Sequence, residues 1–117
     1  MVKIELPYPP SINHYYGRRP RGGVYIKPKG EAFRADVIAR VKSDGLPEVN
    51  GFVSATLNIY PPDRRRRDID NPIKATLDAM QHAGLYEDDC KIKHLECTMH
   101  DKDDDGGRVY VTIKGIK

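Results

Sequence analysis

The sequence predicts a small domain that combines about four strands with two main helices. Three observations predict this class. A chain of 117 residues with 38% hydrophobic content fits one compact domain spanning residues 1–117. Four segments have the alternation or composition of strands, and two have apolar residues at helical spacing. Because such a domain has little room for a deep internal pocket, we expect a macromolecule on its surface and no small-molecule substrate.

The first part of the chain predicts a strand, a loop and a helix. Val2, Ile4 and Leu6 alternate with polar residues, which indicates a short strand ended by the prolines that follow. Residues 9–30 are irregular and rich in Pro, Gly, Arg and Tyr, which predicts a long functional loop. Residues 31–44 carry apolar side chains on one face, which predicts an amphipathic helix that ends at Gly45.

The middle of the chain predicts a second strand and a second helix. Residues 53–59 alternate between apolar and polar, which is the clearest strand pattern in the sequence. A helix should begin near residue 71, because Asp70 or Asn71 can cap its free N–H groups and Pro72 suits the first helical position. Gly84 lies where the glycine after a helix belongs.

The last part of the chain predicts two further strands, over residues 91–99 and 108–113. They are joined by an acidic, glycine-containing segment, residues 101–107, which we interpret as a charged hairpin turn. Part of it resembles a calcium loop, but Thr112 stands where such a loop needs a bidentate Glu. The role of the 101–105 turn stays open.

The net charge of +3 conceals an uneven distribution. Basic residues cluster in residues 18–29 and in the contiguous run 64–67, whereas residues 87–89 and 101–105 are acidic. Two separate basic loops are a plausible footprint for phosphates, although a solvated surface is the default interpretation of either cluster alone. The basic side chains that we expect to contact phosphates are Arg18, Arg19, Arg21 and Lys27 in the first cluster and Arg64, Arg65, Arg66 and Arg67 in the second.

Several classes of site lack support in the sequence. Cys90 and Cys97 have neither the spacing of a redox motif nor that of a zinc site, so we expect reduced thiols. The four histidines form no metal-binding pattern, and no serine or cysteine has a recognisable base partner. We find no secretory leader and no apolar run of about 20 residues, so we expect a cytoplasmic protein without a membrane partner.

Asp68, Asp70 and Lys74 form the most informative cluster. If the backbone is extended where it leaves the second strand, both carboxylates project to the same side and repel each other. A divalent cation between them would relieve this repulsion, and oxygen ligands suit Mg²⁺ or Mn²⁺. Lys74 would project from the first helical turn and hold a phosphate. A third acidic group could come from Asp88 or Asp89, after the second helix.

Each of these features also has a simpler interpretation. Asp70 could serve only as a helix cap, residues 64–67 only as a solvated loop, and residues 88–89 only as a turn. Their occurrence together within about 25 residues favours a phosphodiesterase, which needs cations to grip the backbone and carboxylates to hold a metal.

These residues resemble those of the RusA-type Holliday junction resolvases, and the resemblance covers nearly the whole chain. It rests on Pro62 to Asn71 followed by Lys74, Asp78-Ala79, Ala83-Gly84 and Asp88-Asp89, with Pro9 to Asn13, Tyr15-Tyr16 and Gly107-Arg108 in support. The resemblance implies catalytic roles for Asp68, Asp70, Asp89 and Lys74, with Asp88 a weaker metal ligand. It also implies a homodimeric α+β fold with a mixed sheet, Mg²⁺ or Mn²⁺ dependence, and paired symmetric nicking of four-way DNA junctions. The acidic 101–105 turn and Glu87 depart from the pattern.

The loop of residues 9–30 is a second expected DNA contact. Asn13, Tyr15 and Tyr16 lie beside its cations and could grip the backbone or stack on unpaired bases, whereas the alternative is a disordered loop. Two rival functions remain: a non-catalytic protein that binds branched nucleic acid, and a nuclease for other branched DNA. The sequence leaves open the preferred dinucleotide, the number of metals per site, the basis of junction selectivity, and a phage, prophage or chromosomal setting.

Overall fold

The protein folds around a four-stranded mixed sheet. A computed structural model of the chain describes residues 1–103 and 105–116. The strands lie in the order β1-β6-β4-β5, with β4 and β5 parallel and the other neighbours antiparallel. Their bounds are Val2–Pro7 for β1, Val53–Tyr60 for β4, Ile92–Met99 for β5 and Arg108–Gly115 for β6. The four predicted strands are thus confirmed, and together with the helices they make an α+β fold.

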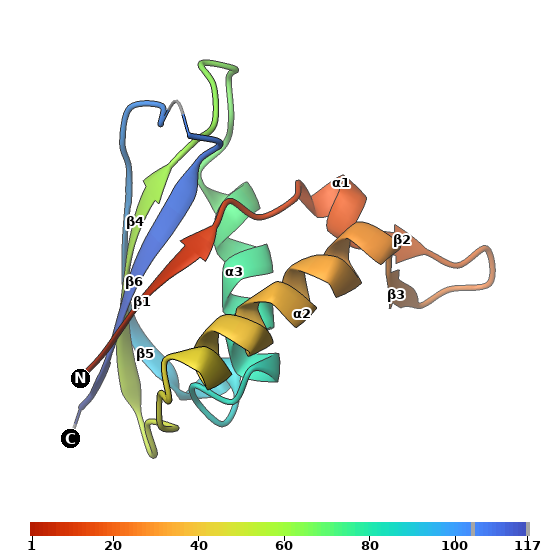
Figure 1. Cartoon of the computed structure of the whole chain (residues 1–117). Helices are drawn as coiled ribbons and strands as arrows, with labels where there is room; N and C mark the ends of the chain where they lie inside the picture. The colour runs from red at the N-terminus through yellow and green to blue at the C-terminus, as the bar shows by residue number, and fades with distance from the viewer. Residues whose placement is uncertain (104, 117) are drawn as a thin grey trace.

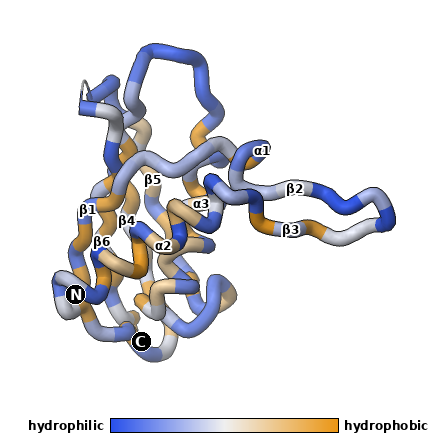
Figure 2. Tube along the Cα trace, turned by 45° about the vertical axis from the view of Figure 1, so that its right-hand side comes forward, coloured by the Kyte–Doolittle hydropathy of each residue, from blue (hydrophilic) through white to orange (hydrophobic). Residues whose placement is uncertain are grey.

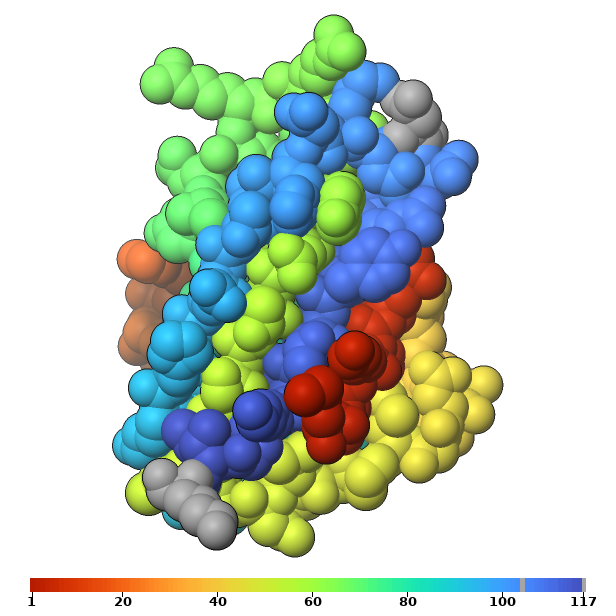
Figure 3. Space-filling model, turned by 90° about the vertical axis from the view of Figure 1, so that its left-hand side faces the viewer, coloured from red at the N-terminus to blue at the C-terminus, as the bar shows by residue number. Residues whose placement is uncertain are grey.

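The sheet has one covered and one open face. Along β4, every second side chain from Val53 to Ile59 is fully buried. Helices α2 (Pro28–Ser43) and α3 (Asp70–His82) lie over this face, and Figure 1 shows both on the same side of the sheet. On the opposite face the four strands lie side by side, with no helix in front of them (Figure 3). Alternation along a strand therefore decides which side chains enter the core.

Helix α2 begins at Pro28 rather than at residue 31, because proline is favoured in the first helical turn. Phe33, Val37 and Val41 form its buried face, as predicted. Gly30 is buried where α2 approaches the preceding segment, and a Cβ there would lie 2.6 Å from the carbonyl oxygen of Tyr15. This close approach holds the N-terminal segment against the helix.

The prediction of one long irregular loop over residues 9–30 is wrong, because this segment forms a short helix and two short strands. It contains α1 (Ile12–Tyr15) and the antiparallel strands β2 (Tyr16–Arg18) and β3 (Val24–Ile26). The two strands form an arm that projects from the body of the molecule (Figures 1 and 2), with positive φ at Gly22 and Gly23 in its turn. Strands of three residues are too short to show a periodic pattern.

The predicted hairpin between the last two strands is also wrong. Strand β6 pairs with β1 and β4, not with β5, so the connection after β5 has to cross the end of β4. The N–H of His100 donates to the carbonyl of Ile59 at 2.8 Å, and the N–H of Asp103 donates to that of Pro61 at 2.7 Å. Asp104, within the predicted turn, lies outside the described residues. Local turn composition cannot reveal this crossing, because pairing is a long-range property.

Helix α3 spans residues 70–82 as expected, but its start differs in detail. Ile69 is the N-cap residue, and no side chain caps the helix. The expected caps are wrong, because Asp70 lies inside the helix and the Asn71 side chain instead accepts a hydrogen bond from the N–H of Ile12 at 3.0 Å. Gly84 has the predicted role, with a φ of 81° just beyond the helix. None of the described helices is long and apolar enough to cross a membrane.

Candidate active site and nucleic-acid interface

The predicted catalytic residues lie on α3 or in the segments that flank it. Asp70, Lys74 and Asp78 are spaced four residues apart, so they share one face of α3. Asp70 and Lys74 are exposed, whereas Asp78 is half-buried. Asp68 lies in the loop just before the helix, and Asp89 begins the short 3₁₀ helix η1 (Asp89–Lys91) that follows it. The chain therefore leaves α3 and returns an acidic residue to the helix, as the sequence predicted.

Asp89 is held by residues of the α3 region. The hydroxyl of buried Tyr86 contacts Asp89 Oδ1 at 2.8 Å and the carbonyl oxygen of Leu77 at 2.5 Å, and the Asp89 N–H donates to Gln81 Oε1 at 3.0 Å. Partial burial raises the pKa of the Asp89 carboxyl, while the Tyr86 hydrogen bond lowers it. Among the charges that act on Asp89, Asp78 raises the pKa and Lys74 lowers it. On balance the pKa of Asp89 is raised, so this environment disfavours the charged form of the carboxyl.

Asp88 differs from its neighbour. Its side chain accepts a hydrogen bond from the N–H of Cys90 at 3.0 Å and caps η1. This hydrogen bond lowers the pKa of the Asp88 carboxyl, whereas the pKa of Asp89 is raised. Asp88 therefore has a structural role as the cap of η1, which agrees with the expectation that it is a weaker metal ligand than Asp89.

The arginine run forms the loop between β4 and α3. Arg64, Arg65 and Arg66 are exposed. Arg67 is held within the loop, because its Nη1 lies 2.7 Å from Asp63 Oδ1 and its guanidinium lies 5.6 Å from the centre of the Tyr8 ring. The ion pair raises the pKa of Arg67 and lowers that of Asp63. The run thus divides into three exposed cations and one that stabilises the loop.

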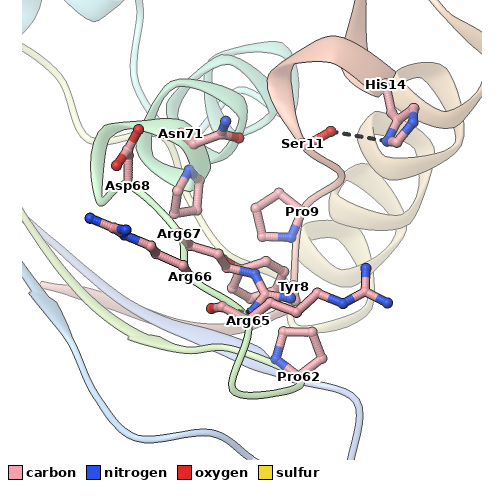
Figure 4. Close-up of a pocket in the computed structure, with 11 residues that line it drawn as sticks. Tyr8, Pro9, Ser11, His14, Pro62, Arg65, Arg66, Arg67, Asp68 and Asn71 are labelled. Carbon is pink, nitrogen blue, oxygen red and sulfur yellow. Dashed lines mark hydrogen bonds between the residues drawn. The ribbon is translucent and has the colours of Figure 1, made fainter.

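Two cavities lie beside these elements, separated by α1. The first, of about 520 Å³, lies between the arginine loop and the N-terminal segment, and both Asp68 and Asn71 line it. Figure 4 shows the side chains of Arg65 and Arg66 extending from the loop to opposite sides. The second, of about 710 Å³, lies between the arm and Lys74. Cations thus border both cavities, as a surface for a phosphate backbone requires.

Comparison with known proteins identifies the family. The family model described as endodeoxyribonuclease RusA matches residues 7–114. The chain belongs to the RusA family. It is similar to the crossover junction endodeoxyribonuclease RusA of Escherichia coli strain K12, with 37% identity over 94% of this chain and 91% of the relative. It is also similar to the corresponding proteins of Enterobacteria phage HK97 (42% identity, 96% and 92% covered) and Enterobacteria phage 82 (38%, 94% and 91% covered).

The chemistry of the RusA-family residues suits a divalent ion, but the described part of the chain gathers no three metal ligands in one place. Asp68, Asp70 and Asp89 supply carboxylate oxygens, which Mg²⁺ and Mn²⁺ prefer. Within residues 1–103 and 105–116, no three His, Cys, Asp or Glu side chains lie close enough together to hold a metal. Mg²⁺ is commonly bound through one or two carboxylates, with waters and substrate phosphates completing the shell. The donor set therefore fits an ion that binds together with the DNA.

A buried polar network was missed by the sequence analysis. Arg34 on α2 donates to Asp78 Oδ2 through Nε at 2.8 Å, and its second guanidinium nitrogen lies 2.7 Å from the same oxygen. The Tyr15 hydroxyl also donates to Asp78 and accepts from Arg34 Nε at 3.0 Å. Because α1, α2 and α3 each supply one member, the network fixes α1 beside the helix that carries the predicted catalytic residues Asp70 and Lys74. The sequence offered one signal that could have revealed this network, namely a charged residue on each of the two predicted helices, Arg34 and Asp78.

This network corrects one predicted DNA contact. Tyr15 is completely buried, so its ring is inaccessible to a base or a phosphate. Burial and the Asp78 hydrogen bond raise the pKa of the Tyr15 hydroxyl, which keeps it protonated as a donor. Asn13, Arg18, Arg19 and Arg21 are exposed, and Tyr16 and Lys27 are half-buried. Tyr15 therefore cannot belong to the predicted DNA-contact surface, and the other residues of that surface stay a prediction.

Proposed function

We propose that this RusA-family protein is a metal-dependent endonuclease that resolves four-way DNA junctions by paired, symmetric hydrolysis of phosphodiester bonds. The observation that carries the proposal is the face of α3 with Asp70, Lys74 and Asp78, to which Asp89 is tied by hydrogen bonds and beside which two cavities are bordered by cations. The names of its relatives, crossover junction endodeoxyribonucleases, support the same activity and substrate. The phage relatives favour a phage or prophage setting, in which the DNA and therefore this protein would be cytoplasmic.

In this proposal, one or two of the carboxylates of Asp68, Asp70 and Asp89 would hold Mg²⁺, for which Mn²⁺ can substitute, and waters and DNA phosphates would complete its shell. The bound ion would supply positive charge at the scissile phosphate and activate the attacking water. Lys74 contacts the phosphate and stabilises negative charge that develops on its oxygens. Tyr86 keeps Asp89 oriented toward α3. Products with 5′-phosphate and 3′-hydroxyl ends are expected.

The cations have separate proposed roles. Arg65, Arg66 and Arg67 line the first cavity and, with Arg64 on the same loop, grip the backbone of one DNA arm. The ion pair of Arg67 with Asp63 also keeps the loop in shape. The basic arm carries Arg18, Arg19 and Arg21 to a second arm of the junction. Because the two groups lie on opposite sides of α1, they suit a substrate with more than one helical arm.

A homodimer is part of the proposal. Resolution needs two symmetric cuts, and a two-fold dimer presents two equivalent sites to a substrate that itself approximates two-fold symmetry. Each protomer would contribute one endonuclease domain spanning residues 1–117.

The decisive experiment is cleavage of a synthetic four-way junction with metal removed by EDTA and then restored. We expect paired nicks in Mg²⁺ or Mn²⁺ and none in EDTA. Asp70→Asn should abolish cutting and leave junction binding intact. A protein that binds junctions but never cuts any branched DNA in either metal would be a non-catalytic binding protein. Equal cutting of four-way, flap and linear duplex DNA would contradict junction selectivity.

A further inference from the structure

The second cavity combines aromatic rings and cations beside a predicted catalytic residue. It lies between the arm and α3 and has a volume of about 710 Å³. Three of its lining side chains are basic and two are tyrosines. The residues that matter are Tyr16, Gly17, Arg18, Tyr25, Lys27 and Lys74.

Tyr25 is placed by a glycine opposite it. In the arm, Gly17 pairs with Tyr25 across the two strands. A Cβ on residue 17 would lie 2.3 Å from a carbon of the Tyr25 ring, so only glycine lets the ring lie against the backbone of β2. Tyr25 is 38% exposed, and the Arg19 guanidinium lies 5.9 Å from the centre of its ring. The arm thus presents an aromatic ring in a fixed place rather than on a free side chain.

On the other wall of the cavity, an aromatic ring lies next to the predicted catalytic residue Lys74. The Lys74 ammonium lies 5.5 Å from the centre of the Tyr16 ring. Lys27 is fixed by a hydrogen bond from its Nζ to the carbonyl of Asn13 at 2.8 Å. Arg18 is exposed at the edge. A ligand here would meet aromatic rings and three cations within one space.

This combination matches one kind of ligand. Cations bind phosphate, and aromatic rings bind the face of a nucleobase, worth about 1–3 kcal/mol per stacked base. In paired duplex DNA the base faces are covered by their neighbours, so only an unpaired base can offer its face to a ring. We propose that the cavity between the arm and α3 is a subsite for a single unpaired nucleotide of the DNA substrate, with its base at Tyr25 and its phosphate toward Lys74.

The subsite rests on the proposed nuclease function, because Lys74 links it to the cutting site. It deepens that function by assigning the arm a base contact in addition to a backbone contact. A nuclease that holds an unpaired nucleotide beside its site would favour DNA in which pairing is interrupted, as it can be at the crossover of a junction.

The test compares two bulged duplexes that differ by one base. Both carry a single extra nucleotide, which is thymidine in one and abasic in the other, so charge and backbone flexibility are matched. Dissociation constants are measured by fluorescence anisotropy with the full-length protein in EDTA, where we expect no bond to be cut. The wild-type protein should bind the thymidine bulge about 5- to 150-fold more tightly than the abasic one.

Variants assign the preference to the arm. Tyr25→Leu should remove most of the preference and leave affinity for the abasic bulge unchanged, whereas Tyr25→Phe should keep it. Gly17→Ala retains the ring but displaces it, so it should also weaken the preference. Tyr110→Leu is the matched control, because Tyr110 is 43% exposed on β6, an element outside both cavities. Thermal melting by circular dichroism verifies that each variant is folded.

Equal binding of the two bulges by the wild-type protein would overturn the subsite. An equal loss of preference in Tyr110→Leu and Tyr25→Leu would do the same. Junction cutting in Mg²⁺ is scored separately. If the protein cuts junctions but shows no base preference, the subsite is wrong and the proposed function stands. If it shows the base preference but cuts no junction in Mg²⁺ or Mn²⁺, the proposed function is wrong and the subsite stands.

Discussion

Removing Asp78 alone should destabilise the protein more than removing its whole network. Asp78→Leu leaves the Arg34 guanidinium without its carboxylate, and the two side chains of the ion pair are only 20% and 22% exposed. Breaking one partner of a buried pair costs about 3–5 kcal/mol, because an uncompensated charge stays buried. Residual solvent access favours the lower end of that range. For a domain of this size, about 3 kcal/mol corresponds to a decrease of about 12 °C in Tm.

The comparison variant replaces all three polar members with apolar ones. Tyr15→Phe, Arg34→Met and Asp78→Leu together remove every charge and hydroxyl of the network. Replacing a buried ion pair with apolar residues of similar volume is often neutral or stabilising. We therefore expect the triple variant to lie within about 1 kcal/mol of the wild-type protein in free energy of unfolding.

Urea denaturation followed by circular dichroism measures both variants. Equal m-values show that the free energies can be compared directly. A triple variant that is less stable than Asp78→Leu would refute the reasoning, since the network would then contribute net stability. A loss below about 1 kcal/mol in Asp78→Leu would show that water solvates Arg34 in place of the carboxylate.

Three further predictions concern other residues. Asp89→Asn should abolish junction cutting in Mg²⁺, whereas Asp88→Asn should cut nearly normally because Asn can retain the cap; a mild effect of Asp89→Asn would mean that another residue completes the site. The Arg108 hydrogen bond lowers the pKa of Asp103, so its stabilisation is present at neutral pH and is lost as the pH falls through the folded-state pKa. Urea titrations should show Asp103→Asn as less stable than the wild type at pH 7 but equal to it well below pH 3.8, and a deficit independent of pH would contradict this. Thr76→Val should raise the free energy of unfolding by about 1 kcal/mol, because the buried Thr76 hydroxyl has no hydrogen-bond partner among the described residues; an unchanged Tm would argue against that penalty.

Features with a local cause could be predicted from the sequence. The four strands and two long helices follow from the period of apolar side chains, and Gly84 follows from the turn after a helix. The cluster of Asp68, Asp70 and Lys74 was visible because its members are neighbours in the chain. The family resemblance rests on this stretch and on residues before and after it, and the comparisons confirm it over residues 7–114.

The tertiary structure decided which of these residues face one another. Whether β5 pairs with β6 depends on strands brought together from different parts of the chain, and local turn residues carry no information about it. Tyr15 was an aromatic residue among cations in the sequence, and only packing against α2 and α3 shows that it is buried. In the sequence, Arg67 cannot be told apart from the three arginines before it, and only the tertiary structure shows its ion pair with Asp63.

The candidate site divides in the same way. The sequence by itself determined the chemical groups, carboxylates and cations within one short stretch, because residue type and spacing along one element are local. Only the tertiary structure showed that Asp89 is tied to α3 through Tyr86 and Gln81, and that the aromatic arm lies on the other side of α1. Contacts between distant segments depend on how the helices pack on the sheet, and that packing is a property of the whole fold.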